Sequence, residues 1–234
     1  MVSEPVMVIT GTSRGVGRSL AEYYARRGYR VVGCSRGGID VPLDNYQHYH
    51  LNVSDESAIG KMHSKIRRQY GRLDVLINNA GIAPTNHVLL TSSREVMESF
   101  NTNYLGTLLF SRESVKLMKA NSFGRIVSLS SVHVPLALEG SAVYGGTKAA
   151  IEQLSRVMAR EVFRFGITVN VLSLSVVQHT GMANTLTEEN RNRVLRHTTT
   201  RQQIDISDIT NAVDFLIDKK SGMVTNQILC LGGA

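Results

Sequence analysis

The segment 6–17, VMVITGTSRGVG, sets the architecture that the rest of the chain follows. Its apolar start predicts a short buried strand, and the three glycines after it predict a tight turn. Apolar residues at helical spacing then continue towards Gly28, which predicts a helix that ends there. A strand, a glycine-rich turn and a helix in this order are typical of a dinucleotide-binding unit, in which backbone N–H groups and the helix N-terminus bind a pyrophosphate. The segment therefore predicts a doubly wound α/β sheet that opens with such a unit.

The second predicted strand, 29–34, ends in residues that bear on the choice of dinucleotide. An acidic residue at this point would hold the ribose hydroxyls of NADH, but the chain has Ser35 followed by Arg36. Arg14 adds a second guanidinium from within the glycine turn. A hydroxyl and two guanidinium groups suit a 2′-phosphate, whereas a carboxylate would repel it. We therefore expect NADPH/NADP+ to be preferred over NADH; the alternative is that both arginines are merely solvated.

The rest of the chain alternates predicted strands and helices without a linker-like stretch, so residues 1–234 are interpreted as one domain. Further strands are predicted at 47–51, 73–77, 125–131, 167–172 and 227–231. Helices are predicted to begin at the N-capping residues Ser54, Ser92 or Ser93, and Ser207. A basic segment at about 176–203 interrupts this alternation and is expected to form the substrate loop.

The composition argues against several classes of protein. The net charge is +7, but Lys and Arg are dispersed along the chain, so nucleic acid is not expected as the main partner. No apolar run approaches the roughly 18 residues of a membrane span, and the N-terminus shows no signal pattern. Cys34 and Cys230 form no redox or metal motif, and His48 and His50 lack a third ligand. We therefore expect a cytoplasmic protein with reduced cysteines, no metal and no membrane partner.

Tyr144 and Lys148 are four residues apart in the sequence Tyr-Gly-Gly-Thr-Lys. On a helix this spacing places both side chains on one face, one turn apart. An ammonium beside a phenol favours the phenolate and would lower the tyrosine pKa from about 10 towards neutrality. Such a tyrosine can exchange a proton at physiological pH. The spacing is also common by chance on ordinary surface helices, so the pair depends on the motifs that accompany it.

Three further polar motifs end predicted strands or interrupt a predicted helix. Residues 78–81, Asn-Asn-Ala-Gly, follow the fourth strand and suit a turn along which a cofactor passes closely. Ser131 ends the fifth strand, where it is either a turn hydroxyl or a substrate contact. Asn103 lies within a helical region, where asparagine marks either a bend or a functional carboxamide.

With the glycine turn, residues 78–81, Ser131 and Tyr144-x-x-x-Lys148 in this order, the chain resembles the short-chain dehydrogenase/reductase family over nearly its whole length. It looks most like the NADPH-dependent β-ketoacyl-carrier-protein reductases. The resemblance implies a Rossmann-type, doubly wound, seven-stranded parallel sheet with three helices on each face, assembled as a homo-oligomer, a tetramer or a dimer. It also implies a catalytic set of Asn103, Ser131, Tyr144 and Lys148.

The implied cofactor site collects residues from the carboxyl ends of the strands. These are Gly11, Ser13, Arg14, Gly15, Val16, Gly17, Ser35, Arg36, Asn52, Val53, Asn79, Ala80, Gly81, Tyr144, Lys148 and Thr180. The chain departs from the family pattern after the sixth strand, where Leu174-Ser175 replaces Pro-Gly and Thr180 comes one residue late. This departure puts the nicotinamide pocket in question. Asn52 stands where an aspartate is frequent.

Three functions follow from these residues. The first is an NADPH-dependent reductase that transfers hydride to a ketone of an acyl or biosynthetic intermediate, small or carrier-bound, with Tyr144 as proton donor. The second is an NAD(P)-dependent alcohol or sugar dehydrogenase. The third is an NADP-binding regulatory protein whose turnover is impaired by the altered loop 174–180. Arginines in the substrate loop could dock an acidic carrier or simply be solvated; they are Arg191, Arg193, Arg196 and Arg201.

Overall fold

A computed structural model describes residues 4–38, 43–178 and 187–234. Its core is a seven-stranded parallel sheet with the strand order β3-β2-β1-β4-β5-β6-β7. The strands are β1 Val6–Thr10, β2 Arg30–Ser35, β3 Tyr46–His50, β4 Val75–Asn78, β5 Gly124–Ser131, β6 Ile167–Leu174 and β7 Ile228–Leu231. The order reverses between β1 and β4, and in open α/β sheets ligands bind outside the carboxyl ends of the strands at such a switch point. The predicted sheet is confirmed.

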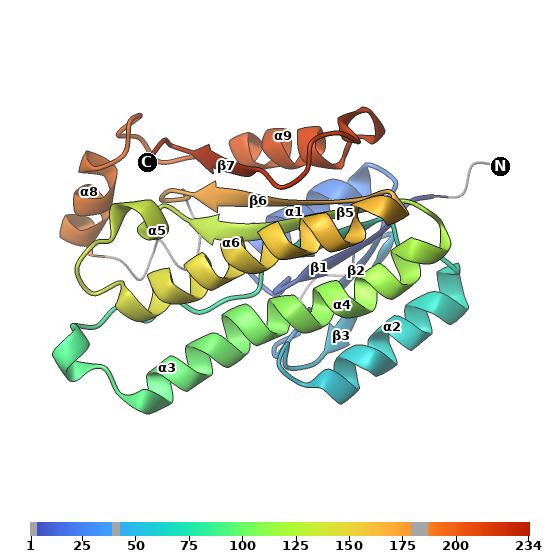
Figure 1. The fold of residues 1–234 in the computed structure, drawn as a ribbon, viewed down its shortest axis with the longest axis horizontal. Coiled ribbons are helices and arrows are strands. Elements are labelled where there is room, and N and C mark those ends of the chain that lie inside the picture. The colour runs from blue at the N-terminus through green and yellow to red at the C-terminus, as the bar shows by residue number, and fades with distance from the viewer. Residues whose placement is uncertain (1–3, 39–42, 179–186) are drawn as a thin grey trace.

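Helices cover both faces of the sheet, which explains why β1, β5 and β6 are buried along their whole length. The helices are α1 Gly15–Arg26, α2 Glu56–Tyr70, α3 Ser93–Ser99, α4 Gly106–Ala120, α5 His133–Leu136, α6 Ala142–Val162, α8 Glu188–Arg196 and α9 Ile206–Ile217. A π-helical segment, Phe100–Leu105, joins α3 to α4. In Figure 1 the arrowheads of β5 and β6 point towards α5 and α8, which lie at the carboxyl end of the sheet.

The two faces have separate apolar cores. Helices α2, α4 and α6 pack on one face, and α1 and α9 pack on the other (Figure 1). The third helix implied for the second face is not found among the described residues. Strands β2 and β3 are joined by the short segment 36–45, and residues 39–42 of this segment are not described.

Several predicted boundaries shift. The α2 helix is capped by Asp55, not Ser54, and α9 is capped by Asp205, not Ser207, because in each case the aspartate carboxylate reaches an amide of the first turn. Ser92 does cap α3, in a capping box with Glu95. The β6 strand continues to Leu174, two residues beyond the prediction, since no Pro-Gly ends it.

The part of the substrate loop that the structure describes is attached to the sheet. The amides of Thr199 and Thr200 donate to the carbonyls of Gly233 and Gly232, at 2.9 and 3.0 Å. Thr187 caps α8, and its side chain accepts from the amide of Asn190. Across the described residues no helix is both long and apolar enough to cross a bilayer. The same residues bring together no group of His, Cys, Asp and Glu that suits a metal ion.

Candidate active site

The glycine turn forms a cradle at the carboxyl end of β1. Gly11 has φ +75°, and its amide donates to the carbonyl of Cys34 at 2.8 Å. Among the described residues no side chain caps the N-terminus of α1, so the first amides of that helix are free for an anion. Ser13 and Val16 lie half-buried in the same turn. The cradle therefore fits the phosphates of a dinucleotide.

Asn79, directly after the neighbouring strand β4, is hydrogen-bonded to this cradle. Its Nδ2 donates to the carbonyls of Thr10 at 2.8 Å and Gly11 at 3.1 Å. In return the Thr10 hydroxyl accepts from the amides of Asn79 and Ala80, at 3.0 and 2.9 Å. A Cβ on Gly11 would lie 2.8 Å from the Cα of Ala80, so the two loops can meet only with glycine there. The predicted residues of the two loops are thus brought together.

Ser35 at the end of β2 is buried, and its hydroxyl is used within the protein. It donates to the carbonyl of Gly37 at 2.5 Å and lies 3.1 Å from the Nε2 of His48. Arg14 and Arg36 are exposed, and no hydrogen bond or ion pair holds either side chain within the described ranges. Both guanidinium groups are therefore available to a ligand, while the Ser35 hydroxyl is bonded to the turn that follows β2.

His48 belongs to a hydrogen-bonded chain that sequence reasoning had weighed only as a metal ligand. Its Nε2 lies 2.9 Å from the carbonyl of Gly37, which can only accept, so Nε2 carries the hydrogen. Its Nδ1 then accepts from the Tyr46 hydroxyl at 2.7 Å, and Tyr46 accepts from Thr12 at 2.7 Å. Burial lowers the pKa of His48 and raises the pKa of Tyr46 to about 12. The alternation of Tyr46 and His48 on one strand face was the only available signal.

The other predicted cofactor residues make contacts within the protein or lie outside the described residues. Asn52 is exposed, and its Oδ1 accepts from the amide of Ser54 at 3.2 Å. Val53 is buried, and it lies against Gly106, where a Cβ would come within 3.0 Å of Val53 Cγ2. Thr180 lies outside the described residues. Ser175, in place of the family glycine, packs on Gly232, and its amide donates to Leu231 at 3.2 Å.

Ser131, Tyr144 and Lys148 come together at the carboxyl end of β5. Ser131 ends this strand, and α6 presents Tyr144 and Lys148 to it on one buried face. The Ser131 hydroxyl lies close enough to the Tyr144 phenol to lower its pKa. The Nζ of Lys148 lies 5.7 Å from the centre of the Tyr144 ring and donates to the carbonyl of Leu129 at 2.7 Å. The three side chains thus form one buried polar cluster.

Burial controls the protonation of this cluster. It raises the pKa of Tyr144, opposed only by the nearby Ser131 hydroxyl, and it lowers the pKa of Lys148 to about 8. The structure therefore contradicts the expectation that Lys148 lowers the pKa of Tyr144. Desolvation of the phenolate outweighs an ammonium that is itself desolvated and bound to Leu129. A raised pKa keeps the phenol protonated at neutral pH.

Asn103 lies in the π-helical segment and is fully buried. Its Oδ1 accepts from the amide of Ile82 at 2.8 Å, and its Nδ2 donates to the Ile82 carbonyl and the Thr147 hydroxyl, both at 2.9 Å. A Cβ on Gly81 would lie 3.2 Å from Asn103 Oδ1 and 3.7 Å from Lys148 Nζ. Asn103 is therefore adjacent to the cluster, but its side chain already holds the loop after β4.

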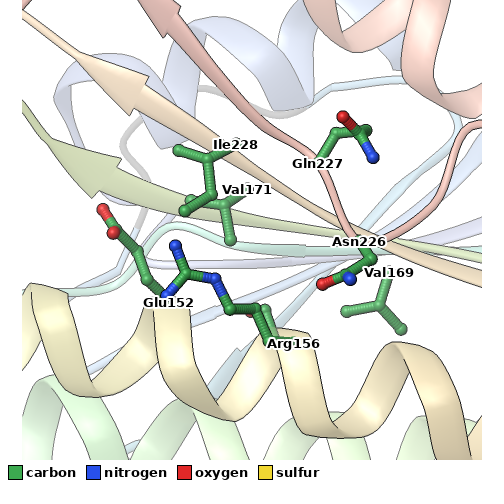
Figure 2. A pocket seen from close by; sticks show the side chains of 8 residues that line it. Glu152, Arg156, Val169, Val171, Asn226, Gln227 and Ile228 are labelled. Atoms are coloured by element: carbon green, nitrogen blue, oxygen red, sulfur yellow. The ribbon is translucent and has the colours of Figure 1, made fainter.

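A small hollow elsewhere on the molecule is distinct from this cluster. Figure 2 shows Glu152 and Arg156 extending from α6 towards Val171 and Ile228, and these four residues line a shallow hollow. Glu152 is buried and accepts from the hydroxyl of Ser130 at 2.7 Å. Ser131, Tyr144 and Lys148 do not line this hollow. The candidate active site is the cluster of Ser131, Tyr144 and Lys148 at the carboxyl end of β5.

Comparison with known proteins shows the family to which the chain belongs. The family described as short chain dehydrogenase matches residues 5–191. The 3-oxoacyl-acyl-carrier-protein reductase FabG of Escherichia coli is 32% identical over 97% of this chain and 96% of its own length. The solved structure of ElxO with NADP bound has a TM-score of 0.89 and 26% identity, covering 97% of each chain. A putative gluconate dehydrogenase from Agrobacterium tumefaciens also has a TM-score of 0.89 and 26% identity, covering 98% of this chain and 94% of its own.

The match spans most of the chain, and it includes the glycine turn, Ser131 and the Tyr144–Lys148 pair. The chain therefore belongs to the short-chain dehydrogenase family, and it is an oxidoreductase that acts on CH–OH and C=O groups.

Proposed function

We propose that the protein is an NADPH-dependent reductase that converts a ketone of an acyl or biosynthetic intermediate into an alcohol, with Tyr144 as proton donor. The observation that carries this proposal is the burial of Ser131, Tyr144 and Lys148 at the carboxyl end of β5, with Tyr144 and Lys148 one helical turn apart on α6. The bound cofactor would supply hydride to the carbonyl carbon.

The residues of the chain would handle the oxygen and its proton. A carbonyl oxygen placed against Ser131 and Tyr144 would accept a hydrogen bond from each hydroxyl. The raised pKa of Tyr144 keeps its proton in place until negative charge develops on that oxygen, which then takes the proton. Lys148 is mostly charged below pH 8 and would stabilise the phenolate that remains. Asn103 would hold Gly81 and Ile82 in place beside Lys148.

The preference for NADPH is supported by charge at the end of β2. Arg14 and Arg36 are exposed on two adjacent loops, and the residue at the strand end is Ser35. ElxO, which this chain resembles, has been solved with NADP bound. The cradle at Gly11 and the free amides of α1 would hold the pyrophosphate.

The substrate class is proposed from the relatives. FabG of Escherichia coli is named for reducing 3-oxoacyl groups on acyl carrier protein, so we propose a 3-oxoacyl thioester, small or carrier-bound, as substrate. We further propose a cytoplasmic homo-oligomer, a tetramer or a dimer. Two exposed apolar side chains, Val157 on α6 and Phe163 directly after it, are consistent with an assembled form, which light scattering would test.

A second candidate is the oxidation of an alcohol or sugar. It is favoured by the likeness to the putative gluconate dehydrogenase. The third function, a regulatory protein without turnover, has less support because Ser131, Tyr144 and Lys148 are all present and buried at the carboxyl end of β5.

The test is NADPH oxidation by the purified protein with a panel of 3-oxoacyl thioesters, compared with NADP+ reduction on sugars and polyols. We expect turnover with the thioesters, and a loss of about 10²–10⁴-fold in Tyr144→Phe with NADPH binding retained. Tyr70→Phe, the same exchange at the end of α2, is the matched control. Oxidation of sugars without thioester reduction would favour the second candidate, and tight NADPH binding without any turnover would favour the third.

A further inference from the structure

An imidazole stands next to the hydroxyl of Ser131. His133 begins α5, two residues after Ser131, and its Nδ1 lies 3.0 Å from Ser131 Oγ. Its backbone amide also donates to the same oxygen, at 3.3 Å. Its ring meets the ring of Tyr144 edge to face, with centroids 5.4 Å apart. His133 therefore contacts two of the three residues of the cluster.

The direction of the hydrogen between Ser131 and His133 decides what Ser131 can do. A hydroxyl donates one hydrogen and accepts two. If Nδ1 is bare, it accepts the Ser131 hydrogen, and none remains for a substrate. If Nδ1 carries a hydrogen, Ser131 Oγ accepts from the amide and from Nδ1, and its own hydrogen is free. The second arrangement lets Ser131 donate to a carbonyl oxygen without leaving Nδ1 unpaired.

We infer that His133 is a positioning residue that donates from Nδ1 to Ser131 Oγ and so directs the Ser131 hydrogen towards the carbonyl of the substrate. The kinetic part of this inference rests on the proposed function. The contact itself does not.

The surroundings of His133 support a neutral donor. The carbonyl of His133 lies against Gly145 on α6, where a Cβ would approach within 3.2 Å, so the main chain is held closely. Burial and the positive charge of Arg193 on α8 lower the pKa of His133, so the ring is neutral at pH 7. Arg193 is itself 3.8 Å from the carboxylate of Glu139. A neutral ring has one hydrogen to place, and Nδ1 faces a hydroxyl that can accept it.

The first test is the ¹⁵N spectrum of the seven histidines of the purified protein, at pH 7.5. His133 is assigned by the resonances that disappear in His133→Phe. We expect His133 to be the Nδ1–H tautomer, and its Nδ1 shift to move in Ser131→Ala. The Nε2–H tautomer, with Nδ1 as an acceptor, would overturn the inference whether or not a substrate has been found.

The second test is kinetic. His133→Phe keeps an aromatic edge against Tyr144 but removes the hydrogen bond, and we expect kcat to fall about tenfold while KM changes little. His133→Asn retains a donor near the Nδ1 position and should recover most of that loss. His87→Phe, at an exposed histidine, is the control for the exchange itself.

A double-mutant cycle separates positioning from a merely structural effect. In a Ser131→Ala background, His133→Phe should lower kcat no further, because the residue acts through Ser131. An equal drop in both backgrounds, or no drop in either, would overturn the inference. If the wild type reduces no ketone while the Nδ1–H tautomer is found, the proposed function fails and the assignment of the contact stands.

Discussion

The choice between NADPH and NADH is expected to depend on Arg14 and Arg36. Both side chains are exposed and held by no partner in the ranges that the structure describes, so truncating either one to alanine removes charge without breaking an internal contact. NADPH differs from NADH by a 2′-phosphate. NADH lacks this group, so it offers the two arginines nothing to bind at that position. The loss should therefore fall on NADPH alone.

The size of the effect follows from Coulomb's law. Two unit charges 4 Å apart in a water-like dielectric interact by about 1 kcal/mol, and a phosphate carries nearly two charges. Each arginine is thus expected to contribute roughly tenfold to thirtyfold to NADPH affinity. Because both side chains are exposed, the contribution should shrink as salt rises, since the screening length falls to about 8 Å near 0.15 M.

The assay is a titration of cofactor binding by fluorescence for Arg14→Ala, Arg36→Ala and the double variant, with NADPH and with NADH. Arg68→Ala, which removes an exposed arginine from α2, is the control. We expect the ratio of NADPH to NADH affinity to fall by about two orders of magnitude in the double variant. An equal loss for the two cofactors, or a wild type that binds NADH better, would refute the reasoning.

Three further outcomes are expected. Lys148 has a pKa of about 8, so its charge is present below that pH and lost above it. Ketone reduction should therefore decline above pH 8. In rate–pH profiles, Lys148→Arg should retain activity to higher pH. His63 is buried, and desolvation lowers its pKa. Its neutral form therefore contributes stability above about pH 6.5, and this contribution is lost as the pH falls. Urea unfolding should show the loss in the wild type and a weaker dependence of the unfolding free energy on pH in His63→Gln. Asn103→Ala removes three hydrogen bonds to Ile82 and Thr147. It should lower kcat, and it should lower the free energy of unfolding by about 1–3 kcal/mol. Asn192→Ala, on the exposed side of α8, should change neither quantity.

Patterns within a few residues were sufficient to predict most of the fold. The strand, turn and helix of 6–17 and the helix start at Ser92 depend on neighbours in the chain, and the structure has them as predicted. The spacing of Tyr144 and Lys148 likewise required only a helix to place both on one face. Errors at this level were small, as at Ser54, where an adjacent aspartate is an equally good cap.

Other properties depend on residues that are distant in the sequence. The chain from Thr12 through Tyr46 to His48 joins the glycine turn to β3, and Asn103 meets Ile82 and Thr147 from different elements. No local pattern indicates which of these polar groups will meet.

The pKa values of the active-site residues show most clearly the difference between what local sequence predicts and what tertiary structure decides. From composition and spacing, Lys148 was expected to acidify Tyr144, because two side chains one turn apart interact. In the folded protein the loss of water around the phenol is the larger influence, and the ammonium is bound to Leu129. Residue types and their spacing identify which groups can react. How strongly each group holds its proton is a property of packing, because desolvation depends on every element that closes around it.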